Sequence, residues 1–218
     1  MKLYTYFRSS AAYRVRIALN LKGLGYEAVP VHLLKDGGEH LRPEYRAINP
    51  LGLVPSLEDA GNLLTQSLAI VEYLEETRPE PALLPKDALA RARVRAFAHG
   101  IACDIHPINN LRILKYLRGP LHQGEDQVQR WIRTWVETGM NALERMVDRP
   151  GRIPQEGGRF CFGDTPGMAD LCLIPQMFNA RRFECDLSGC PTLVAIDAHC
   201  RTLPAFADAA PENQPDAA

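Results

Sequence analysis

Hydrophobic and polar positions in the first 78 residues change repeatedly between the periods that are typical of strands and of helices. The chain starts with the strand-like run Met-Lys-Leu-Tyr-Thr-Tyr-Phe, and an amphipathic helix follows with Val15, Ala18 and Leu19 on one side. This alternation predicts an α/β domain over residues 1–80. The predicted strands cover residues 1–7, about 26–32, 54–58 and 62–65, and the predicted helices cover about 10–23 and 67–77.

The second half of the chain is helical by the same criterion. No helix could cross the proline-dense connector at residues 78–85 intact, and the helical pattern starts at Asp87. A kink is expected at His106-Pro107. We therefore expect an all-helical domain over residues 88–210. The predicted helices are Arg91–Leu117, Gln127–Val147, the very apolar Asp170–Ala180, and Leu193–Leu203, and Pro211–Ala218 is expected to be a loose tail.

Composition narrows the class of protein. Of the 218 residues 46% are hydrophobic, which is enough for a substantial core, and a net charge of −1 gives no basic field for nucleic acid. No apolar run has the length of a membrane span, and Met1 leads into a strand and not into a signal peptide, so the cytoplasm is the expected compartment. The 6 cysteines show no metal-ligand spacing and the 6 histidines are dispersed, so we expect reduced thiols and no metal site.

Polar side chains stand at the start of two predicted helices. Ser9 and Ser10, beside Arg8, follow the first strand, and Gln66-Ser67 precede a later helix. The first N–H groups of a helix lack intrahelical partners and the macrodipole is positive there, so such a start can hold a phosphate, a carboxylate or a thiolate. A plain serine N-cap would explain the first start equally well.

A proline interrupts the strand-like run between these two starts. Because proline cannot donate to a sheet ladder, Pro55 should sit at a bulge, at an edge or after a cis bond. We expect Val54-Pro55 to bring an extended backbone, with its N–H and C=O groups, close to both helix starts.

These segments, in this order and spacing, resemble the zeta class of glutathione transferases, which includes maleylacetoacetate and maleylpyruvate isomerases. The resemblance covers nearly the whole chain. It implies a thioredoxin-like N-terminal domain, an all-helical glutathione-transferase C-terminal domain (α/β plus all-α) and a homodimer. The motifs that carry it are Ser-Ser-x-x-x-Arg-Val-Arg-Ile-Ala-Leu at 9–19, Lys-Asp-Gly-Gly at 35–38, Asn-Pro to Val-Pro at 49–55, Gln-Ser-Leu-Ala-Ile at 66–70, His-Pro-Ile-Asn-Asn at 106–110, Gly-Asp to Pro-Gln at 163–176 and Ala-Arg-Arg-Phe at 180–183.

Glutathione is the cofactor that the resemblance implies. Ser9, with Ser10 assisting, is expected to donate a hydrogen bond to its sulfur, which lowers the pKa of the thiol. Gln66 and Ser67 suit the γ-glutamyl carboxylate. The other expected contacts are the backbone of Val54 and Pro55 to the cysteinyl portion and His40 to the glycyl end. The resemblance also implies that His106 and Asn110 contact glutathione or substrate, in relatives often from the partner subunit, although a hydrogen-bonded structural residue near the kink would explain His106 equally well.

The implied activity is cis-trans isomerisation of maleylacetoacetate to fumarylacetoacetate in tyrosine breakdown. The thiolate adds to the alkene carbon β to the ketone, the resulting single bond rotates, and the thiolate is expelled, so that glutathione acts as a covalent catalyst. Maleylpyruvate is an alternative substrate. A broad transferase that acts on α-halo acids is an alternative activity, and a non-catalytic interaction module is disfavoured because Ser9, Val54-Pro55 and Gln66-Ser67 are intact.

Arginines are the expected ligands of the dicarboxylate substrate, because a guanidinium binds a carboxylate bidentately and can stabilise an enolate. Arg8 lies beside the sulfur-activating serine in the sequence, and the family resemblance places Arg182, more than Arg181, at the substrate pocket. Arg112 is a further candidate. A cation that complements a helix C-terminus would explain Arg182 without any substrate.

Three features lie outside this set. Many zeta-class members carry Cys where this chain has Ala11, so chemistry that needs a protein thiol there is not available. Gly167 occupies the N-cap of a capping box that includes Asp170, which we interpret as a folding element. Arg14 and Arg16 lie within the first predicted helix, where exposure to solvent or pairing between the domains would explain them as well as a functional site would.

Overall fold

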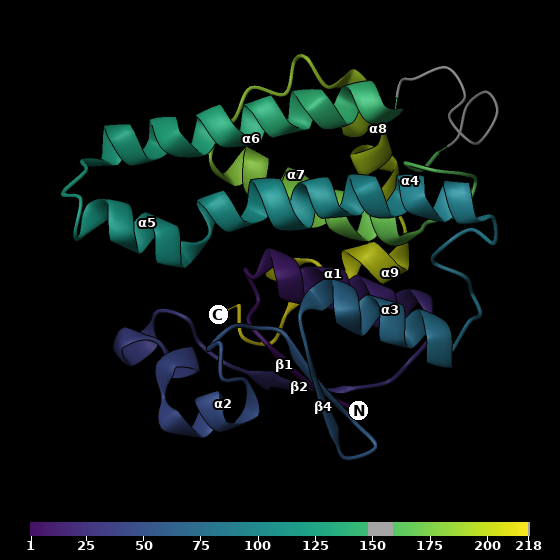
Figure 1. The fold of residues 1–218 in the computed structure, drawn as a ribbon, viewed down its shortest axis with the longest axis horizontal. Helices are drawn as coiled ribbons and strands as arrows, with labels where there is room; N and C mark the ends of the chain where they lie inside the picture. The colour runs from purple at the N-terminus through teal and green to yellow at the C-terminus, as the bar shows by residue number, and fades with distance from the viewer. Residues whose placement is uncertain (148–158, 218) are drawn as a thin grey trace. The chain divides into compact units, whose positions relative to one another are not determined.

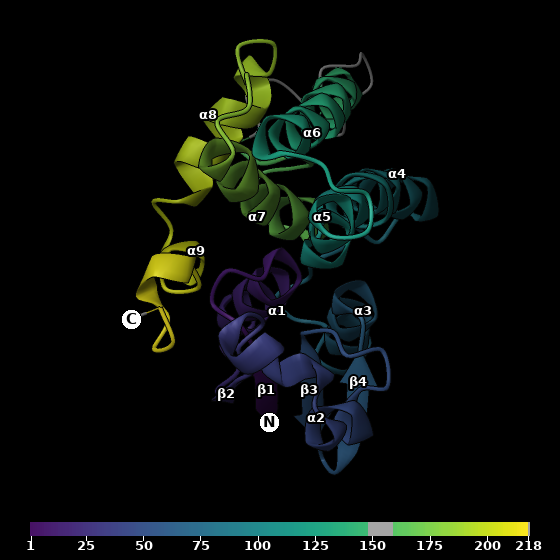
Figure 2. The same cartoon turned by 90° about the vertical axis from the view of Figure 1, so that its left-hand side faces the viewer.

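The computed structural model describes residues 1–147 and 159–217 (Figures 1 and 2). The chain divides into two compact units. The N-terminal unit consists of Met1–Leu83 together with Thr202–Ala218, and the helical unit consists of Leu84–Arg201. The predicted fold class, a small α/β unit followed by an all-helical one, is confirmed.

A four-stranded sheet forms the centre of the N-terminal unit, in the order β2-β1-β3-β4 that Figure 2 shows. Strands β1 and β2 are parallel, which requires a crossover connection, and helix α1 provides it. Strand β3 runs antiparallel to β1 and forms a hairpin with β4. The strands are β1 (Lys2–Thr5), β2 (Glu27–Pro30), β3 (Ser56–Asp59) and β4 (Asn62–Thr65).

Helices α1 and α3 pack against each other on one side of this sheet (Figure 2). Leu3, Val15, Leu57, Ile70 and Leu74 are fully buried in the layer between sheet and helices. The pattern did not predict the short helices between β2 and β3, of which α2 begins with a proline, where the missing N–H costs nothing. The helices before the connector are α1 (Ser10–Leu21), η1 (Lys35–Gly37), η2 (Glu39–Leu41), α2 (Pro43–Ile48) and α3 (Ser67–Thr77).

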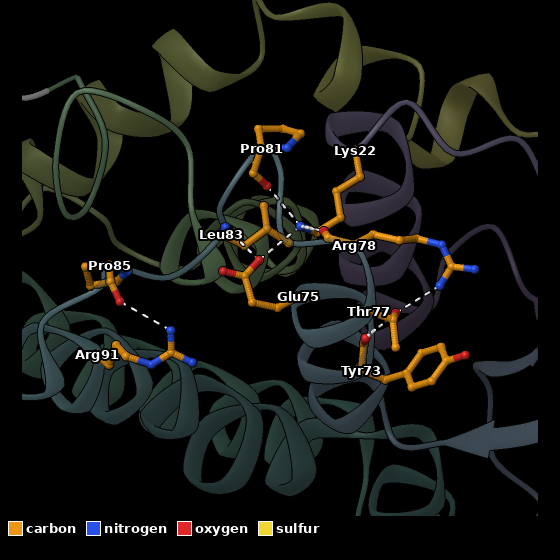
Figure 3. Close-up of polar contacts among 9 residues, drawn as sticks. All are labelled: Lys22, Tyr73, Glu75, Thr77, Arg78, Pro81, Leu83, Pro85 and Arg91. Carbon is orange, nitrogen blue, oxygen red and sulfur yellow. Dashed lines mark hydrogen bonds and ion pairs between the residues drawn. The ribbon is translucent and has the colours of Figure 1, made fainter.

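A buried ion pair holds the connector that follows α3 (Figure 3). Lys22 at the end of α1 donates from Nζ to Glu75 Oε2 at 3.0 Å, to the Arg78 carbonyl at 2.7 Å and to the Pro81 carbonyl at 2.9 Å. The same Glu75 oxygen accepts from the N–H of Leu83 at 2.9 Å. The Lys22 side chain is fully buried, so this cluster satisfies polar groups that no regular element could pair.

The helical unit confirms the predicted interruption at His106-Pro107. The regular helix α4 ends at His99, a π-helical turn and a 3₁₀ turn follow, and Trp131 donates from Nε1 to the Ile108 carbonyl at 3.0 Å. Gly139 of the later helix α6 permits the close packing at this break, because a Cβ there would clash with the Ile105 side chain. The helices are α4 (Ala88–His99), η3 (Gly100–Ile105), η4 (His106–Asn109), α5 (Leu111–Arg118), α6 (Glu125–Val147), α7 (Met168–Arg182) and α8 (Pro191–Cys200).

Helix α7 forms the core of this unit, and its capping box is present as predicted. Asp170 accepts from the N–H of Gly167 at 2.9 Å and from the N–H of Cys161 at 2.8 Å. Burial raises the pKa of Asp170, although these hydrogen bonds oppose the shift. Within the described ranges, no helix has the length and apolarity that crossing a membrane requires.

The C-terminal segment differs from the expected loose tail. It folds onto the N-terminal unit with two short helices, α9 (Pro204–Ala207) and η5 (Pro211–Asn213). Tyr13 of α1 donates from Oη to the Phe206 carbonyl at 3.3 Å, and Asn20 donates to the Ala205 carbonyl at 3.0 Å. In the predicted tail itself, Gln214 donates to the carbonyls of Asp208 and Ala210, and Asp216 accepts from the N–H of Phe7, so the prediction of a loose tail is wrong for the described residues 211–217. The segment from residue 202 groups with the N-terminal unit, not with the helical one that we expected to extend to 210.

Candidate active site

Three of the predicted binding segments meet at one end of the sheet. The strand register pairs Tyr4 with Ser56 and Ser56 with Thr65. The carboxyl end of β1, the amino end of β3 and the carboxyl end of β4 therefore lie side by side. The turn that contains Ser9, the Val54-Pro55 segment and Gln66 are the direct continuations of these three strand ends.

Ser9 is the N-cap of helix α1. Its backbone is extended, and its Oγ accepts a hydrogen bond from the N–H of Ala12 at 3.2 Å. A hydroxyl carries one donor hydrogen and two acceptor lone pairs, so the capping bond leaves the hydrogen available for a sulfur atom. The N-cap role and the sulfur-activating role are thus compatible. Ser10 is the first helical residue and is buried, whereas Ser9 is half-buried, which favours Ser9 for a bound thiol.

The peptide bond between Val54 and Pro55 is cis, which is one of the three possibilities that the sequence left open. The preceding carbonyl, that of Leu53, accepts from Tyr45 Oη and from Asn49 Nδ2, both at 2.7 Å. Because Tyr45 and Asn49 are buried, these bonds fix the path of the chain into Val54.

The second helix start has two features that favour an anion. Gln66 has φ 69°, a left-handed value that costs a non-glycine residue about 1–3 kcal/mol and that clusters at functional sites. In the described part of the chain, the Gln66 side chain does not cap α3, so this side chain accepts no hydrogen bond from the first N–H groups of the helix. Gln66 is exposed and Ser67 is buried.

Arg14 adds a buried cation to this start. Its Nη1 donates to Ser67 Oγ at 3.2 Å, and the residue is only 2% exposed. Arg16 is also fully buried. Exposure to solvent is therefore wrong for both arginines, and Arg14 contacts Ser67, which is one of the predicted site residues. Their position among the apolar residues 12–19 was the signal that could have marked them as buried, because a helix face this apolar lies in the core.

His40 lies in η2, is buried, and has two glycines close to it. A Cβ on Gly38 would clash with the His40 ring, and a Cβ on Gly52 would lie 2.9 Å from the His40 carbonyl. Both glycines also have positive φ angles. His40 is thus close to the chain that enters Val54. Arg8 is exposed, and its guanidinium lies 4.7 Å from the centre of the Phe7 ring.

The remaining predicted site residues belong to the helical unit. His106 begins η4 and is partly buried. Asn110 is the N-cap of α5, where its Oδ1 accepts from the N–H of Arg112 at 2.9 Å. The Arg112 side chain is exposed.

The structure distinguishes the two arginines at the end of α7. Arg181 forms an ion pair with Asp197 of α8, whose side chain is 1% exposed. Arg182 is exposed, and its guanidinium lies 5.0 Å from the centre of the Phe183 ring. The Phe183 carbonyl accepts from Gln129 at 2.6 Å and from Arg133 at 3.2 Å, so the helix end that carries Arg182 is held in place. Arg181 is therefore engaged in an ion pair with a buried carboxylate, and Arg182 presents an exposed guanidinium at the end of the helix.

Within the described ranges, neither the cysteines nor the possible metal ligands indicate a disulfide or a metal site. All six cysteines are free thiols, and burial raises the pKa of Cys185 to about 11. Among the described residues, no cluster of three or more His, Cys, Asp or Glu side chains could hold a metal ion.

The chain is similar to several known proteins along its length. A family model described as glutathione S-transferase, N-terminal domain, matches residues 3–82. The maleylacetoacetate isomerase of Pseudomonas aeruginosa is 50% identical over 217 residues, which cover 99% of this chain and 98% of the relative. A solved holo structure of maleylpyruvate isomerase, called a bacterial glutathione-S-transferase in zeta class, has a TM-score of 0.95 at 50% identity and covers both chains completely. The maleylacetoacetate isomerase of Methylobacterium extorquens AM1, solved with bound malonate and GSH, has a TM-score of 0.93 at 42% identity, again with complete coverage of both chains.

Proposed function

This chain belongs to the zeta-class glutathione transferase family, and we propose that it is a glutathione-dependent cis-trans isomerase that converts maleylacetoacetate to fumarylacetoacetate. The observation that carries the proposal is the convergence at one sheet end of the Ser9 hydroxyl, the Val54-Pro55 segment and the α3 start at Gln66-Ser67. The full-length identity to isomerases of this family supports the same conclusion.

The residues at the sheet end fit the charged parts of glutathione. The N–H groups that begin α3, with the buried Arg14 behind Ser67, suit the γ-glutamyl carboxylate. The Ser9 hydroxyl hydrogen and the positive end of α1 suit a thiolate. The extended Val54 backbone suits the cysteinyl amide, and His40 suits the glycyl end.

Bound glutathione supplies a thiolate that adds reversibly to the alkene, so that the bond can rotate before the thiolate leaves. The protein's own residues hold the reactants. Ser9 stabilises the negative sulfur by hydrogen bonding, which lowers the pKa of the thiol. Arg8 and Arg182, with Arg112 as a further cation, bind the two substrate carboxylates and the negative oxygen that develops at the ketone.

The oligomeric state and the cellular compartment that we propose are those that the family resemblance implies. We propose a homodimer in the cytoplasm, in which His106 and Asn110 contribute contacts to glutathione. Size-exclusion chromatography with light scattering tests the dimer, and the expected mass is twice that of the chain. A monomeric mass for the active protein would contradict this part of the proposal.

Maleylpyruvate is the second candidate substrate, because the maleylpyruvate isomerase above matches this chain along its whole length. The two substrates differ at the ketone end and share the cis-enedioate group. The same cations would therefore bind either one. A transferase that acts on α-halo acids would use the same Ser9 but would need no pair of carboxylate ligands.

Turnover of maleylacetoacetate and maleylpyruvate, measured side by side with and without glutathione, tests the proposal. We expect isomerisation that requires glutathione without consuming its thiol, and a higher kcat/KM for maleylacetoacetate. A higher kcat/KM for maleylpyruvate would reassign the substrate. If neither compound reacts and a halo acid consumes glutathione stoichiometrically, the protein is a transferase and the isomerase proposal is wrong.

A further inference from the structure

The C-terminal segment contacts the turn that carries Ser9, the proposed sulfur donor. The N–H of Phe7 donates to Asp216 Oδ2 at 2.9 Å, across 209 positions of sequence. Arg8 and Ser9 follow Phe7 directly. A carboxylate from the C-terminal segment therefore binds the backbone one residue before the candidate site begins.

The buried guanidinium of Arg16 holds the same turn from the other side. Its Nη2 donates to the Phe7 carbonyl at 3.0 Å, and its Nη1 donates to Thr5 Oγ1 at 3.0 Å and to the Tyr6 carbonyl at 3.4 Å. The Tyr6 carbonyl also accepts from the N–H of Ser9 at 2.9 Å. The peptide groups on both sides of Phe7 are thus bound through their polar atoms.

Arg16 also binds the C-terminal segment. Its Nε donates to the Ala209 carbonyl at 3.0 Å, so a single guanidinium connects the turn after β1 with the segment that contains Asp216. Burial lowers the pKa of Arg16 to about 10, while Tyr26, Tyr13 and Asp216 oppose the shift. The group remains charged at neutral pH, and Asp216 is the carboxylate that partly balances it.

The segment itself is ordered before it reaches Asp216. Gln214 donates from Nε2 to the carbonyls of Asp208 at 2.8 Å and Ala210 at 3.0 Å, and helix α9 packs on α1. Asp216 is half-buried. These bonds bring its carboxylate to Phe7 on a folded support and not on a free end.

We propose that Asp216 is a positioning residue for the reaction. Together with Arg16, it fixes the peptide groups of Phe7 and thereby the orientation of Arg8 and of the Ser9 hydroxyl. This inference rests on the proposed function in one respect, namely that Ser9 activates the glutathione sulfur. Misplacement of catalytic groups by a fraction of an ångström lowers rates steeply, so a contact outside the pocket can control turnover.

Four proteins test the inference: the unsubstituted chain, Asp216→Ala, Asp216→Asn and Glu212→Ala. Alanine removes the acceptor for the Phe7 N–H, whereas asparagine keeps an oxygen acceptor of the same shape without the charge. Glu212 is exposed on the same segment, so its substitution is the matched control for loss of one negative charge. Circular dichroism and thermal unfolding first establish that each variant is folded at the assay temperature.

Two measurements distinguish a positioning role of Asp216 from a contribution to folding stability alone. The first is the apparent pKa of the thiol of bound glutathione, followed by thiolate absorbance against pH, and the second is the division of the effect between kcat and KM. For Asp216→Ala we expect a higher thiol pKa and a kcat that is lower by about tenfold, with a smaller change in KM. Asp216→Asn should recover most of the rate, and Glu212→Ala should match the unsubstituted protein.

The inference is overturned if Asp216→Ala lowers only the thermal stability and keeps the kcat and the thiol pKa of the unsubstituted chain. An equal loss of kcat in Glu212→Ala would also overturn it. The thiol titration does not require an isomerisable substrate. A raised thiol pKa in Asp216→Ala would therefore support the positioning role even if the unsubstituted chain turned over neither maleyl compound.

Discussion

Replacing Ser9 by alanine perturbs two interactions of one hydroxyl, and their magnitudes can be estimated separately. The Oγ atom caps helix α1 by accepting from the Ala12 N–H at 3.2 Å. Loss of a serine N-cap to alanine costs about 1 kcal/mol of stability, within a range of about 0.5–2, whereas loss to glycine costs only a few tenths. Ser9→Ala should therefore lower the free energy of unfolding, and Ser9→Gly should do so much less.

The effect on turnover should not follow stability. A hydrogen bond to a charged group contributes about 1.5–3 kcal/mol, and every 1.4 kcal/mol is a factor of ten. If the Ser9 hydroxyl donates to the thiolate, both Ser9→Ala and Ser9→Gly should lower kcat/KM by about 10- to 150-fold. The glycine variant separates the two roles, because it keeps the helix start and loses the donor.

The assay is glutathione-dependent isomerisation with thermal unfolding measured on the same preparations. Ser9→Thr, which keeps a hydroxyl, should retain much of the activity, and Ser10→Ala should have the smaller effect because Ser10 is buried within the helix. The reasoning is refuted if Ser9→Ala leaves turnover unchanged while Ser10→Ala abolishes it. It is also refuted if activity falls in Ser9→Ala but not in Ser9→Gly, since helix capping alone would then explain the loss.

Three further substitutions test other contacts. Lys22→Met leaves a buried carboxylate and two carbonyls without their donor and should lower the free energy of unfolding by about 3–5 kcal/mol, measured in urea. Arg181→Ala should lower thermal stability because it removes the cation beside the buried Asp197 carboxylate. Arg182→Ala, at an exposed side chain, should lower thermal stability less and should lower kcat/KM for the dicarboxylate. Burial alone would raise the pKa of Asp59, but hydrogen bonds from Tyr73 and Arg78 hold it below 3.8. The stabilisation by the Asp59 carboxylate should therefore be complete above pH 3.8 and should be lost as the pH falls through the lower pKa of the folded state. In acid unfolding, the stabilities of Asp59→Asn and of the unsubstituted chain should become equal at low pH.

Hydrophobic periodicity and the positions of prolines were sufficient to predict several of the helices and one interruption. The strand and helix periods located α1 and α3, and the missing N–H of Pro107 predicted the interruption that separates α4 from α5. The π-helical turn at Gly100–Ile105 has no such signal, because its extra residue per turn is set by packing against α6 and not by local composition.

Long-range contacts account for most of what the sequence did not reveal. The C-terminal segment is polar and contains prolines, which is typical of a loose tail, but its partners lie 185 to 209 positions away in the sequence. Tyr13, Arg16 and Asn20 bind its main-chain carbonyls, and the N–H of Phe7 binds its Asp216 carboxylate. No pattern within the segment encodes these partners. The serines and Gln66 were predictable as helix starts, whereas the burial of Arg14 behind Ser67 depends on how α1 and α3 pack.

Helix α1 connects the two helix starts through its two buried arginines. Because an α-helix turns about 100° per residue, side chains two positions apart leave it about 200° apart. Arg14 accordingly reaches Ser67 at the start of α3, while Arg16 reaches the opposite way to the β1 turn and to the Ala209 carbonyl. The same rigid helix therefore sets the position of the proposed sulfur donor relative to the proposed carboxylate site. A displacement of α1 would therefore change the distance between the two proposed contacts of a glutathione molecule. The Arg-x-Arg spacing and the two polar helix starts together set this distance.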